Sequence, residues 1–212
     1  MSGYLTVKGE VERLEIIERS KFICKLSHVE NEEEAQDFID KIKKEHSLAT
    51  HNCYAYVADE KGLVQKFSDD GEPQGTAGLP MLSALKGSGL KKTVAVVTRY
   101  FGGIKLGTGG LARAYGGAVS ECVKLAEIVD MKKVVFVEMV TDYDEYSKLN
   151  NLLMRSQIPV VETLFENEVR VKVAVKIEDE NSEEKFLQKL LDLFKGKDVV
   201  AFKEYGYYPF KV

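Results

Sequence analysis

Residues 99–115 read RYFGGIKLGTGGLARAY. They follow the apolar run 93–98 (TVAVVT), which predicts a strand buried on both faces, and they lead into a helix expected to end near Leu125. Five glycines in this stretch permit positive φ angles and a close approach of the backbone to a ligand. The start of a helix adds free N–H groups and the positive end of the helix dipole. This strand–loop–helix unit is therefore a candidate anion-binding site.

Basic charge is concentrated around this loop. Residues 73–120 contain six Lys or Arg but no Asp or Glu, so the stretch carries a charge of +6. The whole chain carries −4, which leaves −10 for the remainder. Such segregation indicates a local anion-binding surface on an otherwise acidic protein.

Length and composition define the class of protein. The 212 residues are 44% hydrophobic and 30% charged, which is typical of one large or two small soluble globular domains. No apolar run approaches the ~20 residues of a spanning helix, and the first residues lack the pattern of a secretory signal. Three scattered cysteines, Cys24, Cys53 and Cys122, form no CxxC pair and favour a reducing compartment. We expect a cytoplasmic protein without a membrane partner.

The chain reads as two blocks with a break near residues 129–133. The first block, 1–131, alternates strands and helices and is α+β. Its elements are expected at 11–17, 22–26, a helix from Asn31, a hairpin at 53–58 and 63–68, a helix at 79–85, the strand 93–98 and the helix that follows the glycine loop. The second block, 132–212, has the order βαββαβ, which is the ferredoxin-like arrangement. Its strands are expected at 134–139, 160–165, 169–177 and 199–203, and its helices at 146–154 and from Ser182 to Gly196.

The glycine loop has several interpretations. It is not a phosphate-gripping Walker loop, because Thr108 stands where that motif has its Lys. Residues 107–112 match the dinucleotide-binding fingerprint loosely, but the preceding strand ends several residues too early for the tight turn of that motif. A generic site for phosphate or nucleic-acid backbone, built from loop amides with Arg99, Lys105 and Arg113, remains open. So does a structural role, in which glycines permit tight packing and the basic side chains are solvated.

The acidic segment 68–80 (SDDGEPQGTAGLP) is a second candidate. Its carboxylates could ligate Mg²⁺, form an acidic turn, or pair with Arg99 or Lys105 of the glycine loop. His51 is a candidate general base, although no motif places a nucleophile beside it, and the alternative is a histidine bonded to backbone at a strand start. The chain has only three histidines and no HExxH pattern, so we predict no metal site built on His and Cys.

Several motifs together resemble one family, the YigZ/IMPACT family. They are RSKFI (19–23), HNCYAY (51–56), SDDGEP (68–73), GTAG (75–78) and RYFGGIKLG (99–107). The resemblance covers nearly the whole chain, with the first block as the IMPACT domain and the second as the small C-terminal domain of bacterial members. It implies a left-handed βαβ fold like that of a small-subunit ribosomal protein and of elongation factor G domain IV. It also implies a C-terminal domain like that of elongation factor G.

The resemblance links the chain to translation, because eukaryotic IMPACT proteins regulate it by competing for an activator of a starvation kinase. We expect a non-catalytic binding protein that contacts RNA or the ribosome, without a cofactor. The alternatives are an enzyme or small-molecule binder that recognises a phosphate-containing ligand at the same loop, and a regulator that binds another protein. The predicted binding residues are Arg99, Tyr100, Gly102, Gly103, Lys105, Gly107, Gly109, Arg113, His51, Asp69 and Asp70.

Overall fold

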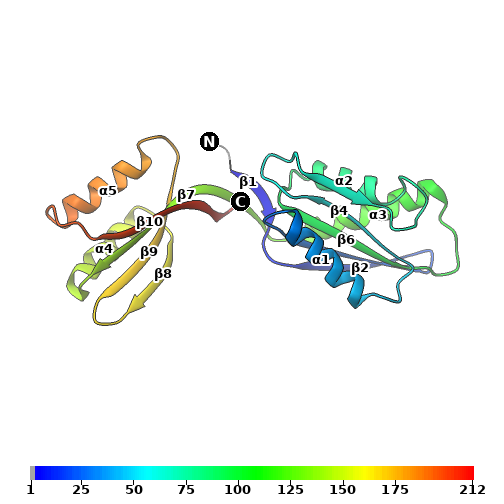
Figure 1. Ribbon diagram of the computed structural model, residues 1–212, viewed down its shortest axis with the longest axis horizontal. Coiled ribbons are helices and arrows are strands. Elements are labelled where there is room, and N and C mark those ends of the chain that lie inside the picture. Colours follow the sequence, from blue (N-terminus) through cyan, green and yellow to red (C-terminus); the bar gives the residue numbers. More distant parts are fainter. Residues whose placement is uncertain (1–2) are drawn as a thin grey trace. The chain divides into compact units, whose positions relative to one another are not determined.

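The computed structural model describes residues 3–212 (Figure 1). They divide into two compact units. Tyr4–Asp130 with Lys211–Val212 make up the N-terminal unit, and Met131–Phe210 with Gly3 make up the C-terminal unit. Both units contain helices and strands, so the predicted α+β class is confirmed. Among these residues, no helix has the length and apolar character needed to cross a membrane.

The N-terminal unit is built on an antiparallel five-stranded sheet of order β2-β3-β6-β4-β5. These strands are β2 (Val11–Ile17), β3 (Ser20–His28), β6 (Thr93–Tyr100), β4 (His51–Val57) and β5 (Gln65–Ser68). The central strand β6 is buried from Thr93 to Arg99, as its apolar run predicts. A short strand, β1 (Tyr4–Val7), pairs with β7 (Ile128–Thr141). The region expected as a break, 129–133, therefore lies inside one continuous strand.

Helices cover both faces of this sheet (Figure 1). On one face, α1 (Glu32–Glu45) buries its apolar stripe against β4 and β6, and Asn31 caps it by accepting a hydrogen bond from the Glu34 N–H (3.0 Å). On the other face lie α2 (Gly78–Gly87) and α3 (Gly107–Leu125). The larger core sits between these two helices and the sheet, and α3 leads directly out of the glycine loop.

The C-terminal unit follows the predicted order βαββαβ. After β7 come α4 (Tyr143–Arg155), β8 (Val160–Phe165), β9 (Val169–Lys176), α5 (Ser182–Leu193) and β10 (Val200–Lys211). Strand β9 lies between β7 and β8, and β10 pairs with the other side of β7. Alternate valines of β7 and β9 face α4 and α5 and form the core.

Strand β10 runs well beyond the predicted span 199–203. Gly206 and Pro209 argue against a strand by their residue types, but β10 lies at an edge, where Pro need not donate a hydrogen bond. Gly206 also permits a close approach, because a Cβ there would lie 2.9 Å from Cε2 of the Phe136 ring. The edge position and this close contact explain why the strand continues.

Candidate functional site

The glycine loop, residues 101–106, joins the end of β6 to the start of α3. Its position is set by Gly102, where a Cβ would lie 2.1 Å from the carbonyl oxygen of Arg19 in the β2–β3 turn. The Gly102 N–H also donates to Oγ of buried Ser20 at 3.1 Å. Only glycine permits this approach, so the loop and the turn hold each other in place.

A buried ion pair lies beneath the loop. Nη1 of Arg99 is 2.7 Å from Oε1 of Glu72, and only 5% of Arg99 and 8% of Glu72 is exposed. Phe22 and Phe101 contact the guanidinium, with ring centroids 5.4 Å and 5.3 Å from its carbon. Nε of Arg99 is buried and has no hydrogen-bond partner among residues 3–212. Charges removed from water to this degree require close pairing, and here the pair is close.

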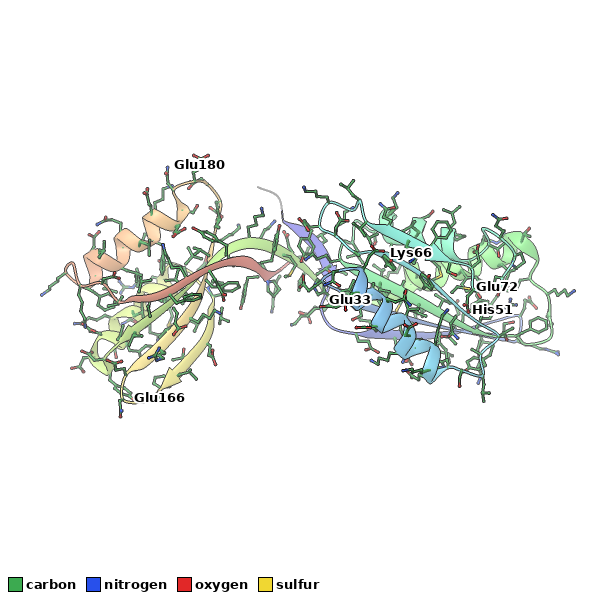
Figure 2. All side chains as sticks on the ribbon, viewed as in Figure 1. Glu33, His51, Lys66, Glu72, Glu166 and Glu180 are labelled. Atoms are coloured by element: carbon green, nitrogen blue, oxygen red, sulfur yellow. The ribbon has the colours of Figure 1, made fainter. Side chains whose placement is uncertain are left out.

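Two further side chains approach the same carboxylate. The hydroxyl of Tyr115, on α3, donates to Oε1 of Glu72 at 2.8 Å. Burial raises the pKa of Tyr115, and nearby Cys53 and Glu72 raise it further, so the hydroxyl keeps its proton and remains a donor. Nε2 of His51 lies 3.9 Å from Oε1, while its Nδ1 donates to the carbonyl of Asp70 at 2.8 Å. Figure 2 labels His51 and Glu72 at the same end of this unit.

His51 reaches this position because of strand register. It pairs directly with Arg99 across β4 and β6. Its ring nitrogen Nδ1 bonds to a backbone carbonyl, which matches the structural interpretation of this histidine. Its other nitrogen faces the buried carboxylate, so the register also places it in the candidate site.

A pocket of about 440 Å³ opens over the ion pair. It is lined by Thr50, His51, Glu72, Pro73, Arg99, Phe101, Lys105, Leu106, Gly107, Thr108 and Leu111. The first turn of α3 forms part of its wall, contains no acidic residue and has no side-chain cap. Four predicted residues, Arg99, Lys105, Gly107 and His51, thus share one pocket.

The two predicted aspartates have structural contacts. The carboxylate of Asp69 accepts hydrogen bonds from the N–H groups of Gly75, Ala77 and Gly78 at 2.8–2.9 Å. Burial opposes its ionisation, but these three donors outweigh burial and hold the pKa of Asp69 below its usual range. Asp69 therefore shapes the acidic segment and the start of α2.

The carboxylate of Asp70 also has structural partners. It pairs with Lys43 at 2.9 Å and accepts from the Asn52 N–H at 2.7 Å. Among residues 3–212, no group of three or more His, Cys, Asp or Glu side chains is arranged to hold a metal ion. One predicted alternative for this segment is confirmed, because its third carboxylate, Glu72, pairs with Arg99.

The other predicted residues lie around the pocket rather than in it. Arg113 lines a neighbouring hollow of about 440 Å³ with Glu18, Ile104 and Lys105. The hydroxyl of Tyr100 lies 3.0 Å from Nδ1 of His46, the residue that follows α1. The backbone of Gly102 lies against the β2–β3 turn, whereas Gly103 and Gly109 are exposed.

Three residues that give the site its charge and its rings, Glu72, Tyr115 and Phe101, were not among the predicted binding residues. Glu72 was one of three similar carboxylates in its segment, and sequence gives no means of choosing among them. Tyr115 lies on the buried face of a helix, where its hydroxyl requires a hydrogen-bond partner. This feature of the sequence could have indicated a buried polar contact. Phe101 comes just after Arg99 and Tyr100 in the sequence. Its ring is 46% exposed, and the pattern of neighbouring residues did not indicate this exposure.

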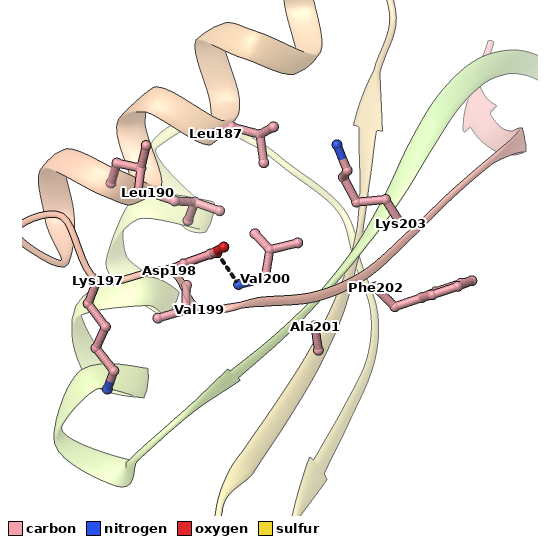
Figure 3. A pocket seen from close by; sticks show the side chains of 10 residues that line it. Leu187, Leu190, Lys197, Asp198, Val199, Val200, Ala201, Phe202 and Lys203 are labelled. Carbon is pink, nitrogen blue, oxygen red and sulfur yellow. Dashed lines mark hydrogen bonds between the residues drawn. The ribbon is translucent and has the colours of Figure 1, made fainter.

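The C-terminal unit offers a different kind of hollow, shown in Figure 3. This groove of about 510 Å³ lies between α5 and the segment that enters β10. Leu187 and Leu190 extend toward it, and Asp198 accepts a hydrogen bond from the Val200 N–H at 2.9 Å. The buried residues that line this groove, Leu190 and Val199, are apolar. The groove therefore lacks the buried charges that distinguish the pocket over Arg99.

Residues 18–123, which include β3, the acidic segment and the glycine loop, match the model of the Impact N-terminal domain. The chain belongs to the IMPACT family. It is 46% identical over 207 residues to IMPACT family member YvyE of Bacillus subtilis, covering 98% of this chain and 94% of that protein.

Other IMPACT-family proteins show the same relationship. IMPACT family member YigZ of Escherichia coli is 37% identical over 179 residues, covering 82% of this chain and 87% of YigZ. Protein IMPACT of Danio rerio is 37% identical over 94 residues, covering 42% of this chain and 29% of that protein. A crystal structure titled as that of a hypothetical protein superimposes with a TM-score of 0.62 at 34% identity, covering 96% of this chain and 99% of that one. The bacterial relatives therefore share both units of the chain.

Proposed function

We propose that this IMPACT-family chain is a non-catalytic protein that binds RNA, including RNA of the ribosome, and acts in the regulation of translation in the cytoplasm. The contact is the glycine-loop surface, which we define as Arg19, Lys105 and Arg113 around residues 101–106. The observation that carries this proposal is that all three cations are exposed and lack an ion-pair partner within residues 3–212.

Some other basic side chains of the same unit form ion pairs, whereas Lys66 and Lys86, which have none within residues 3–212, lie away from the glycine loop. Lys8, Lys41 and Lys124 each lie 2.6–3.0 Å from a glutamate. The hollow shared by Lys105 and Arg113 is lined by one acid, Glu18, whereas Glu72 in the neighbouring pocket is buried and paired with Arg99. Cations without acidic partners gain most from phosphate, because binding releases the counterions condensed on RNA.

The apolar side chains beside these cations favour single-stranded RNA. Phe101 and Ile104 are 46% and 36% exposed at the same loop. Unpaired bases stack on exposed aromatic rings while neighbouring cations contact the backbone. The resemblance to eukaryotic regulators of translation supports a role in translation, although those relatives act by competing for a protein activator.

Binding of a short fluorescein-labelled single-stranded RNA, measured by anisotropy between about 50 and 200 mM salt, tests this proposal. We expect Lys105→Gln with Arg113→Gln to weaken binding at least tenfold and to lower the salt slope by about 1.4, since each phosphate contact on a single strand contributes about 0.7. Binding of purified ribosomes is measured on the same variants by co-sedimentation.

The matched control is Lys66→Gln with Lys86→Gln, which removes the same charge. Lys66 pairs in register with Tyr56, away from the loop end of the sheet, and Lys86 lies in the last turn of α2. The control should bind like the wild type. If both double variants bind alike, or if the wild type binds no RNA, the proposal is wrong and a protein partner becomes the better explanation.

A further inference from the structure

The pocket over Arg99 and Glu72 has features that a surface for RNA backbone does not require. Arg19 and Arg113 do not line it, whereas two charged residues that are more than nine-tenths buried, Arg99 and Glu72, do. A buried ion pair at a pocket floor is costly to maintain for stability alone. Its volume of about 440 Å³ falls within the range of small-molecule sites, about 300–1,000 Å³.

The floor of the pocket offers hydrogen-bond acceptors. Both hydrogen bonds to the Glu72 carboxylate, from Arg99 and Tyr115, end on Oε1. Oε2 thus has no hydrogen-bond partner among residues 3–212. A carboxylate held in this way is suited to accept from the hydroxyls of a ribose, as acidic residues do in nucleotide sites.

One wall of the pocket is suited to an anion. The charges of Arg99 and Glu72 offset each other, which leaves Lys105 as the exposed cation of the lining. Gly107 and Thr108 contribute the uncapped first turn of α3, with its N–H groups and the positive end of the helix dipole. Together they favour a phosphate group.

The third element is an aromatic ring at the opening. Phe101 lines the pocket, contacts the Arg99 guanidinium and is still 46% exposed. A half-exposed ring beside an anion site provides a face for a nucleobase.

We propose that this pocket binds a ribonucleotide that carries a 5′-phosphate. The phosphate contacts Lys105 and the start of α3, the ribose hydroxyls donate to Glu72, and the base stacks on Phe101. The ligand is either a free mononucleotide or the 5′-phosphorylated end of an RNA, which share this chemistry. The inference goes beyond the proposed function, because it rests on the buried pair rather than on Arg19 and Arg113.

Calorimetric titration of the full chain with adenosine 5′-monophosphate tests the inference. We expect adenosine, which lacks the phosphate, and the 2′-deoxy analogue, which lacks a donor to Glu72, each to bind about tenfold more weakly. Ribose 5-phosphate, which lacks the base, should also bind about tenfold more weakly. If the wild type binds neither adenosine 5′-monophosphate nor ribose 5-phosphate, the inference is overturned.

Substitutions at two exposed aromatic residues test whether the nucleotide binds in this pocket. Phe101→Ala should weaken adenosine 5′-monophosphate about tenfold and leave ribose 5-phosphate unchanged, because only the base contacts the ring. Phe67→Ala, at a ring of β5 that is 42% exposed and outside the pocket, is the matched control and should bind both as the wild type does. Equal effects of the two substitutions would place the binding elsewhere and overturn the inference.

A comparison of one RNA with a 5′-phosphate and with a 5′-hydroxyl separates the two sources. Tighter binding of the phosphorylated RNA, reversed by adenosine 5′-monophosphate, identifies an RNA end as the ligand. Equal binding of the two RNAs, with the mononucleotide still bound, identifies the free nucleotide. Arg113→Gln should weaken RNA but not the mononucleotide, so failure of the proposed function and failure of this inference are distinguishable.

Discussion

The guanidinium of Arg99 and the carboxylate of Glu72 meet 2.7 Å apart, although the two residues come from different segments and both are buried. The hydroxyl of Tyr115 completes the contact from a third segment. This cluster joins the central strand, the acidic segment and the helix after the glycine loop. It is therefore both a structural junction of the N-terminal unit and the floor of its charged pocket.

Glu72→Gln should lower the free energy of unfolding by about 3–5 kcal/mol, because it leaves the Arg99 charge buried without a counter-charge. Urea unfolding monitored by circular dichroism gives the value. Glu121→Gln is the control, since it breaks a pair with Lys124 whose side chains are 41% and 68% exposed. The control should unfold at the wild-type midpoint, and a Glu72 variant that did the same would show that the pair is not buried in solution.

Asp69→Asn should cost about 2–3 kcal/mol at neutral pH, because the carboxylate accepts three backbone hydrogen bonds. The lowered pKa of Asp69 sets the sign of the pH dependence. Its contribution is fully present above the unfolded pKa of about 3.9 and is lost as the pH falls through the lower folded pKa. Stability curves of variant and wild type should therefore converge below about pH 4; a constant difference down to pH 2 would contradict this account.

Gly102→Ala should destabilise the chain by about 2–3 kcal/mol, because a Cβ at 2.1 Å from the backbone of Arg19 forces the glycine loop and the β2–β3 turn apart. Gly117→Ala is the matched control, since nothing lies within 4 Å of its Cβ position in α3. It should stabilise the chain by about 0.5–1 kcal/mol, because alanine is the better helix former. Thermal unfolding of both variants measures the contrast, and a neutral Gly102 variant would argue against the close approach.

The thiol of Cys53 should resist modification. Burial raises its pKa to about 12, so almost no thiolate exists at pH 8. Cys24 and Cys122 are also fully buried. Reaction with Ellman's reagent should be slow in the folded chain and should reach all three thiols in guanidinium chloride. Rapid labelling of one thiol under native conditions would show local opening of the core.

Much of the fold could be predicted because its signals are local. The stripe of Ala35, Phe38, Ile39 and Ile42 does face the sheet from α1, and 93–98 does form the buried centre of β6. The order of the C-terminal unit also agrees. Strand β10 was predicted too short, because Gly206 and Pro209 are tolerated for reasons of edge position and a tertiary contact with Phe136.

For the candidate site, too, local features could be predicted from the sequence and long-range contacts could not. The amino-acid sequence by itself determined the element types, the family, the glycine loop and the concentration of basic charge at 73–120, since each is a property of neighbouring residues. Only the tertiary structure selected Glu72 from three carboxylates and gave Asp69 and Asp70 structural partners. The physical reason is that burial and partnership depend on strand register and helix packing, which join residues far apart in the chain.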